Sequence, residues 1–173
     1  MSGWDCHAHL FGPYDRFPLS SNRSYTPPEA VESAYLAMLS KLGLDHGVLV
    51  HPGAYGEDFS LLFEALSNNA NLRGVIVVRP ETLPTLKPLR AQGIRAARFS
   101  HRSDPASTLP GSASFADLVS LAPALADAGL HAELWTDCKA LPDICCQKEE
   151  TFHKRWPWPT NRSDLKKHFL TFG

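Results

Sequence analysis

The stretch "DHGVLVHPGAYGEDFSLLFEALSNNANLRGVIVVRP", residues 45–80, shows the pattern on which the whole chain is built. Its two outer parts, "GVLV" and "GVIVV", are apolar without alternation, which is typical of parallel strands buried on both faces. Between them, apolar residues recur at the spacing of one helix face, at Leu61, Leu62, Ala65 and Leu66. This spacing predicts a helix with one buried side. The stretch is therefore a βαβ unit.

The same alternation continues on both sides of this stretch. Strands are expected over residues 4–11, 45–52, 72–80, 94–100 and 130–137, and helices over residues 26–43, 57–69, 81–93 and 114–129. Thr26 and Ser114 are candidate N-caps, because short polar side chains bind free backbone N–H groups. Gly43 and Gly129 are typical of helix ends. Five strands alternating with helices predict an α/β protein with a parallel sheet.

The composition is that of one ordinary globular domain. The chain has 173 residues, of which 43% are hydrophobic and 20% charged, and its formal net charge is -1 at pH 7. This length suffices for one domain with a hydrophobic core. The small net charge gives no reason to expect binding to nucleic acid or to anionic membranes. The longest apolar runs are far shorter than the roughly 20 residues of a membrane-spanning helix.

The cysteines and the N-terminal residues indicate a reducing compartment. Cys6, Cys138, Cys145 and Cys146 have neither the spacing of a disulfide framework nor that of a zinc knuckle. Polar residues such as Asp5 stand where a signal peptide would need an apolar segment. We therefore expect a cytoplasmic protein.

The first expected strand, "WDCHAHLF", contains a His-x-His motif. Side chains alternate along a strand, so Asp5, His7 and His9 are expected on one face and the residues between them on the other. Two buried imidazoles without partners are costly, so a metal ion, an anionic substrate or a hydrogen-bond network is needed to explain them. Two imidazoles on one face are suited to chelating one divalent metal such as zinc.

A pair of structural histidines is the alternative interpretation, because a bare His-x-His also occurs by chance. The position of the pair favours a functional site, since it ends the first strand and a Gly-Pro loop follows at once. In parallel α/β folds the active site lies at the carboxyl ends of the strands. His7 and His9 are therefore candidate catalytic residues.

Other candidate site residues belong to the fourth and fifth strands. Arg95 and Arg98 differ by three positions, so on one strand they face opposite sides and one of them can reach a site. An arginine that faces a pocket is suited to binding a carboxylate through two hydrogen bonds. His101 and Arg102 lie in the following loop, where they either contact substrate or are solvated. Asp137 ends the fifth strand and is a candidate supporting residue.

Four segments stand in a specific order over residues 3–143. They are "DCHAHLFGPYDRFPL" with "YTPPEA", "LGLDHGVLVHPGAYGED", "LRGVIVVRPE" and "GIRAARFS". In this order they resemble the amidohydrolase-related (amidohydrolase 2) family, in the branch that contains 2-pyrone-4,6-dicarboxylate lactonase. The resemblance implies a (β/α)8 TIM barrel and a hydrolase acting on a lactone, or a related cyclic ester or amide, of a carboxylated small molecule. A decarboxylase is the alternative chemistry on this fold.

The resemblance also implies roles for the histidine pair and for two carboxylate-binding residues. His7 and His9 match a pair that holds a divalent metal in most of the superfamily. In the lactonase branch this pair helps to bind and polarise the substrate without a metal. Tyr25 matches the tyrosine of "YTPP", which contacts a substrate carboxylate. Arg98, rather than Arg95, matches a strand-4 arginine with the same role.

Three further substrate-binding residues follow from the same likeness. Arg102 is matched to a second carboxylate-binding arginine, although its spacing departs from the family pattern. Trp135 stands where the lactonases carry an aromatic residue on the fifth strand. Tyr55 or His51 takes the place of a small polar residue that the family carries after the second strand. The expected partner is therefore a carboxylated small molecule.

The later catalytic motifs of the family are missing. A complete barrel needs eight strands and about 250 residues. The resemblance implies a histidine in a "DH-G" motif on the sixth strand and, on the eighth, an aspartate that acts as the general base. Neither motif is present, and the composition changes at Asp143/Ile144. We predict an incomplete barrel over residues 1–143, truncated there, and a divergent basic tail over residues 144–173 that packs poorly.

Truncation would have two consequences. A five-stranded parallel sheet leaves open edges with unpaired backbone groups, which favours self-association. A chain without its general base would be a non-catalytic barrel fragment, and this is the alternative to a hydrolase.

Overall fold

The computed structural model describes residues 3–81, 86–104 and 111–140 of the chain. Its strands are β1 (Trp4–Ala8), β2 (His46–Val50), β3 (Leu72–Val77), β4 (Ile94–His101) and β5 (His131–Thr136). Its helices are α1 (Glu32–Leu42), α2 (Ser60–Asn68), α3 (Lys87–Ala91) and α4 (Phe115–Ala128), and a 3-10 turn, η1, spans Gly53–Tyr55. Strands and helices alternate, as the sequence predicts.

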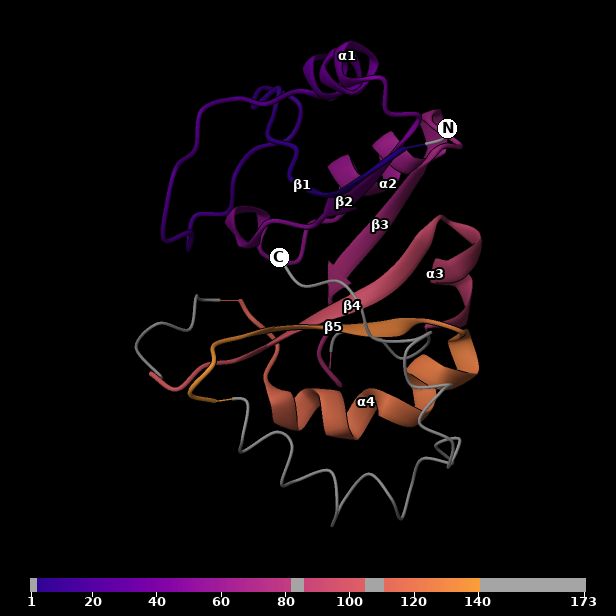
Figure 1. Cartoon of the computed structure of the whole chain (residues 1–173). Helices are drawn as coiled ribbons and strands as arrows, with labels where there is room; N and C mark the ends of the chain where they lie inside the picture. Colours follow the sequence, from indigo (N-terminus) through magenta and orange to yellow (C-terminus); the bar gives the residue numbers. More distant parts are fainter. Residues whose placement is uncertain (1–2, 82–85, 105–110, 141–173) are drawn as a thin grey trace.

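The five strands form one sheet in the order β1-β2-β3-β4-β5, so neighbours in the sequence are neighbours in space (Figure 1). Every neighbouring pair is parallel, which requires a crossover connection between consecutive strands. The result is half of a (β/α)8 barrel, and the predicted fold class is confirmed. The predicted boundary at Asp143/Ile144 and the basic tail lie outside the described residues and stay predictions.

The two sides of the sheet carry different residues. On one side, Leu49 and Phe99 are almost completely buried in the main core, together with apolar residues of α1, α2 and α4. Burial of each such side chain contributes about 1.5–3 kcal/mol. On the opposite side, a smaller cluster contains no helix residue and consists of Val48, Val50, Val75 and Ala96. This second side corresponds to the interior of a barrel.

Helix α4 begins and ends where the sequence predicts. The Ser114 hydroxyl accepts the backbone N–H of Asp117 at 3.1 Å, and the Asp117 carboxylate accepts the backbone N–H of Ser114 at 2.7 Å. This reciprocal pair is a capping box. Gly129, with φ of 66°, follows α4, and Gly43, with φ of 67°, follows α1, which is the left-handed conformation that glycine adopts readily. In the described ranges, no helix is both long enough and apolar enough to cross a membrane.

Helix α1 begins later than expected. The sequence suggested Thr26 as its N-cap, but the helix starts at Glu32. The segment before it is extended, because Ala30 and Phe11 pair through two backbone hydrogen bonds of 2.8 and 2.9 Å. Two prolines precede this bridge, and a residue before proline is disfavoured from helical conformation. The prediction of Thr26 as the cap is therefore wrong.

Candidate active site

His7 and His9 lie together at the carboxyl end of β1. Their Nε2 atoms are 3.3 Å apart, and their rings meet edge to face with centroids 5.0 Å apart. The Nδ1 atom of His9 is 2.7 Å from the carbonyl oxygen of Val50, at the end of β2. Val50 belongs to the cluster on the barrel-interior side. Two neighbouring strands thus hold the pair where parallel α/β folds place their active sites.

Asp5 does not share this side of the sheet. The pairing register between β1 and β2 shifts between Asp5 and Ala8, so β1 contains a bulge. Asp5 Oδ2 accepts a hydrogen bond of 3.0 Å from the hydroxyl of Tyr35, which is buried on α1. Gly47 leaves room for that hydroxyl, since a Cβ atom there would lie 2.1 Å from it. The expectation that Asp5 shares a face with the histidines is wrong, because strict alternation fails at a bulge.

Arg98 on β4 connects His7 to Glu133 on β5. The Arg98 Nε atom donates to Glu133 Oε1 at 2.6 Å, and Nη2 makes a second, short contact with the same oxygen. Nη2 also lies 3.3 Å from Nδ1 and 3.5 Å from Nε2 of His7. Strands β1 and β4 are three positions apart, about 14 Å in a flat sheet. Side chains of the two strands meet because the sheet curves toward this side.

His7 is exposed and His9 is partly buried, and their partial desolvation and the charge of Arg98 both favour neutral imidazoles. Burial lowers the pKa of His7 from its usual 6.5, and Arg98 lowers it further against the opposing effects of Glu133 and Asp5. Burial also lowers the pKa of His9, although its hydrogen bond to a backbone carbonyl acts in the other direction. A neutral imidazole offers one donor and one acceptor. Its N–H group can stabilise negative charge that develops on a carbonyl oxygen.

Arg102 and Trp135 form a second group beside Asp137. The Arg102 guanidinium carbon lies 4.7 Å from the centroid of the Trp135 ring, within the range of a cation–π interaction. Arg102 Nε is 3.6 Å from an Asp137 carboxylate oxygen. Hydrogen bonds to Asp137, of which the backbone N–H of Ser103 has the largest effect, lower the pKa of that carboxyl. The structure brings Arg102 and Trp135 together, and their substrate roles stay predictions.

Tyr25 is linked to the histidine pair through the ring of Phe11. The ring centroids of His9 and Phe11 are 6.2 Å apart, and those of Phe11 and Tyr25 are 6.5 Å apart. Tyr25 is exposed, so its predicted contact with a substrate is sterically open. His101, by contrast, packs against Phe115 of α4, with ring centroids 5.3 Å apart. His101 therefore faces the helices rather than the histidine pair.

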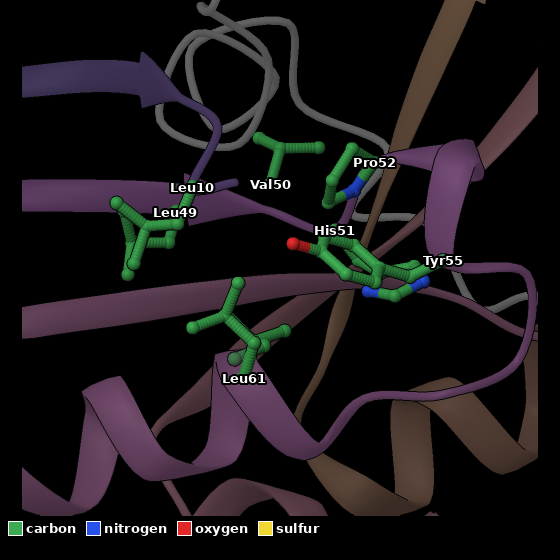
Figure 2. Close-up of a pocket in the computed structure, with 8 residues that line it drawn as sticks. Leu10, Leu49, Val50, His51, Pro52, Tyr55 and Leu61 are labelled. Atoms are coloured by element: carbon green, nitrogen blue, oxygen red, sulfur yellow. The ribbon is translucent and has the colours of Figure 1, made fainter. Parts of the chain in front are cut away.

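Tyr55 and His51 lie in the packed region between β2 and α2. Tyr55 Oη accepts the backbone N–H of Gly12 at 2.7 Å, and His51 Nε2 is 2.9 Å from the carbonyl oxygen of Gly56. Both side chains line an apolar cavity with Leu61 (Figure 2). The cavity has about 10 Å³ of free space, room for about one water. This placement argues against the predicted substrate contact of Tyr55 or His51, because both residues are only 4% exposed.

A family model described as "Amidohydrolase" matches residues 4–163. The chain belongs to the amidohydrolase family. The match continues beyond residue 143, where the sequence suggested the end of the family-like part.

Curated relatives of this amidohydrolase are named as lactone or pyrone hydrolases. A 4-sulfomuconolactone hydrolase of Rhizobium radiobacter is 39% identical over 99 residues, which are 56% of this chain and 33% of the relative. A 2-pyrone-4,6-dicarboxylate hydrolase of Comamonas testosteroni is 28% identical over 142 residues, which are 81% of this chain and 45% of the relative. The chain therefore spans less than half the length of these relatives.

Solved structures share the fold of this amidohydrolase. A probable 2-pyrone-4,6-dicarboxylic acid hydrolase from Acinetobacter baumannii, with citric acid bound, superposes with a TM-score of 0.68 and 25% identity. The match covers 87% of this chain and 55% of that structure. A protein from Agrobacterium tumefaciens superposes with a TM-score of 0.72 and 18% identity over 87% of this chain and 53% of its own. This second likeness shows the fold alone.

The predicted zinc or other divalent metal at the histidine pair can be tested against the geometry. The Nε2 atoms of His7 and His9 are close enough, at 3.3 Å, to contact one ion. However, the guanidinium of Arg98 lies 3.3 Å from His7, and its positive charge repels a cation. Across residues 3–81, 86–104 and 111–140, no three His, Cys, Asp or Glu side chains converge as a metal site requires. The described side chains therefore do not fit a metal.

Glu133 is the residue of this amidohydrolase site that sequence reasoning did not single out. It is the direct cross-strand partner of Arg98 in the pairing of β4 with β5. Opposite charges at paired positions attract each other. Alternation along a strand puts residues 133 and 135 on the same face, but only the pairing register sets Glu133 beside Arg98.

Proposed function

We propose that this amidohydrolase opens a lactone, or a related cyclic ester or amide, of a carboxylated small molecule. One observation carries the proposal: the Arg98–Glu133 pair of β4 and β5 reaches the histidine pair at the carboxyl end of β1. A neutral imidazole N–H is suited to polarising a carbonyl, and an arginine is suited to binding a carboxylate. A carboxylated lactone presents both groups.

The proposed reaction adds water to the lactone carbonyl carbon and breaks the bond from that carbon to the ring oxygen. Negative charge develops on the carbonyl oxygen in the tetrahedral intermediate, where an imidazole N–H group of the histidine pair, the Nε2–H group of His7, would stabilise it by hydrogen bonding. The ring oxygen takes a proton and leaves as a hydroxyl group, and the former carbonyl becomes a carboxylate. The base that accepts the proton of water is not assigned to any described residue.

Arginines at the same end of the sheet support an anionic substrate. Arg98 would bind a substrate carboxylate through the part of its guanidinium that Glu133 leaves open. Arg102, over the Trp135 ring, would bind a second anionic group, with Tyr25 near the rim. Relatives are named as hydrolases of 4-sulfomuconolactone and 2-pyrone-4,6-dicarboxylate, and a related structure holds citric acid. Each of these compounds carries acidic groups.

The test compares hydrolysis of three matched lactones that carry no, one or two carboxylates. Proton release at constant pH measures ring opening. We expect turnover of the carboxylated lactones only, and a His7→Gln/His9→Gln double variant serves as the inactive control. Equal turnover of the uncharged lactone, or release of carbon dioxide in place of ring opening, would contradict the proposal. Binding of the carboxylated compounds without any turnover would favour a non-catalytic fragment.

We also propose a cytoplasmic location. Cys6 and Cys138 are exposed free thiols, a state that a reducing compartment preserves. Cell fractionation followed by thiol labelling checks the expectation, and recovery of oxidised protein from an extracytoplasmic fraction would contradict it.

A further inference from the structure

A chain of hydrogen bonds runs from Arg98 through His7 and His9 to the carbonyl oxygen of Val50. At each end of the chain, the chemistry of the group fixes which atom donates the proton. At one end, Arg98 Nη2 lies 3.3 Å from Nδ1 of His7, and a guanidinium can only donate. At the other end, Nδ1 of His9 lies 2.7 Å from the carbonyl oxygen of Val50, which can only accept. Between the ends, the Nε2 atoms of the two histidines are 3.3 Å apart.

These ends leave one arrangement of protons that satisfies the three shortest contacts, those of 2.7 and 3.3 Å. Because Arg98 donates to it, Nδ1 of His7 is unprotonated, and the proton of the neutral ring is on Nε2. Because the Val50 carbonyl accepts from it, Nδ1 of His9 carries a proton, and the lone pair is on Nε2. The Nε2–H group of His7 then donates to Nε2 of His9. The other contact of Arg98 with His7, to Nε2, is longer, at 3.5 Å, and in this arrangement it is not a hydrogen bond, because both atoms are donors.

Glu133 holds the donor end of this chain in place. Its Oε1 atom accepts hydrogen bonds from both Nε and Nη2 of Arg98. The Nη2 amino group has two hydrogens, so one is directed to Glu133 and the other remains for His7. Arg98 and Glu133 are paired positions of β4 and β5, and their side chains are only 21% and 26% exposed. Backbone register and partial burial therefore both favour one orientation of the guanidinium.

We propose that Glu133 is a positioning residue that acts through Arg98 to keep the proton of His7 on Nε2. Without Glu133, the guanidinium is free to turn away, and the His7 proton distributes over both ring nitrogens. Insofar as it concerns catalysis, the inference rests on the proposed function, in which a lactone carbonyl accepts the Nε2–H group of His7. Asp5 also contacts His7, but its Oδ1 accepts the backbone N–H at 3.3 Å and leaves the ring to Arg98.

The test is nitrogen-15 NMR of the substrate-free protein with labelled histidine rings, and His7→Gln identifies the signals of His7. In the wild type, His7 Nδ1 should show the chemical shift of an unprotonated nitrogen and Nε2 that of a protonated one. In Glu133→Gln, which keeps the shape but removes the charge, both shifts should move toward each other. Glu133→Asp should restore much of the difference. Wild-type His7 shifts in Glu133→Gln would overturn the proposal.

A matched control and a second variant separate positioning from general damage. Glu64→Gln removes the carboxylate that binds Arg16 at 2.8 Å on the surface, and it should leave the His7 shifts unchanged. If Glu133→Gln fails to fold, Arg98→Lys replaces it, because lysine keeps the charge but cannot form the fork. Unchanged His7 shifts in Arg98→Lys would equally overturn the proposal.

A kinetic measurement tests the catalytic part with a lactone that the wild type hydrolyses. Glu133→Gln should lower kcat about 100-fold, as displaced catalytic groups do, and Glu133→Asp should recover part of the loss. A rise in KM with kcat unchanged would overturn the positioning role. If the wild type hydrolyses no lactone while the NMR shifts respond as expected, the proposed function fails and the role of Glu133 in fixing the proton stands.

Discussion

His9 directly follows strand β1 and His51 directly follows strand β2, yet the two imidazoles have different kinds of neighbours. His9 contacts a second imidazole, which in turn contacts a paired arginine. His51 packs against Phe59, with ring centroids 4.5 Å apart, and its Nε2 meets a backbone carbonyl. Burial is the main cause of a lowered pKa in both. The comparison teaches that a lowered pKa does not by itself identify a site, whereas the partners of the imidazole do.

Among the variants that compare these two regions, the largest expected effect is the loss of activity in Arg98→Met. Truncating one partner of a shielded charge pair costs about 2–5 kcal/mol in binding, so kcat/KM for a carboxylated lactone should fall at least about 30-fold. Steady-state kinetics measures this, and Arg16→Met, in an exposed ion pair, is the control with little expected change. Unchanged substrate affinity in Arg98→Met would show that Arg98 does not bind substrate. The surroundings of His9 would then not differ in function from those of His51.

Next in size is the acid sensitivity that His51 contributes. Burial lowers its pKa from 6.5 to about 4, so between these values the unfolded chain binds more protons than the folded one. The free energy of unfolding should therefore fall as the pH drops from 6.5 through about 4, by about 3 kcal/mol in total. Denaturant unfolding at several pH values should show a smaller fall in His51→Gln.

The control for this experiment is His46→Gln, which removes a histidine at the opposite end of β2. The lowered pKa values of His7, His9 and His131 also contribute to the fall, but they do so equally in both variants. If the two variants show the same pH dependence, His51 is not the buried, neutral residue that the comparison requires.

A smaller effect is expected for Tyr55→Phe. Its hydroxyl accepts the backbone N–H of Gly12 in a buried position, and leaving such a donor unpaired costs about 1–3 kcal/mol. Thermal unfolding should therefore show a destabilised protein whose kinetics with a carboxylated lactone are unchanged. The opposite result, a raised KM at constant stability, would restore Tyr55 as a substrate contact.

The smallest change is expected for Ser114→Ala. Loss of the N-cap of α4 should cost about 1 kcal/mol in the free energy of unfolding, without any effect on turnover. Denaturant titration and kinetics on the same sample measure both quantities. Helix α4 packs on the side of the sheet opposite the histidine pair. A clear loss of kcat would therefore show that packing on the helix-covered side affects the site on the barrel-interior side.

The sequence was sufficient where local features decide the structure. The apolar runs of β2 and β3, the inward face of α2 and the caps at Ser114 and Gly129 all depend on residues close together in the chain. The histidine pair could be selected because it ends a predicted strand, whereas alternation left Arg95 and Arg98 open and the resemblance to the lactonase branch favoured Arg98. Their roles in catalysis, like those of Tyr25 and Arg102, stay predictions.

Features that depend on contacts between distant segments could not be read in this way. The bulge that separates Asp5 from the histidines appears only when β1 pairs with β2. The late start of α1 follows from the bridge between Ala30 and Phe11. The partnership of Arg98 and Glu133 requires the register of β4 and β5. In each case the deciding interaction joins two segments that are not neighbours in the sequence.

Because of the bulge, β1 and its neighbour β2 should differ in how well they tolerate the deletion of one residue. Between Asp5 and Ala8, β1 contains one residue more than its pairing with β2 uses. Deleting the codon of Cys6 would thus leave Asp5 toward α1 and both imidazoles on the other side. Deleting one codon within β2 would instead turn its remaining residues to the wrong face. In a library of single-codon deletions, β1 is the strand expected to survive.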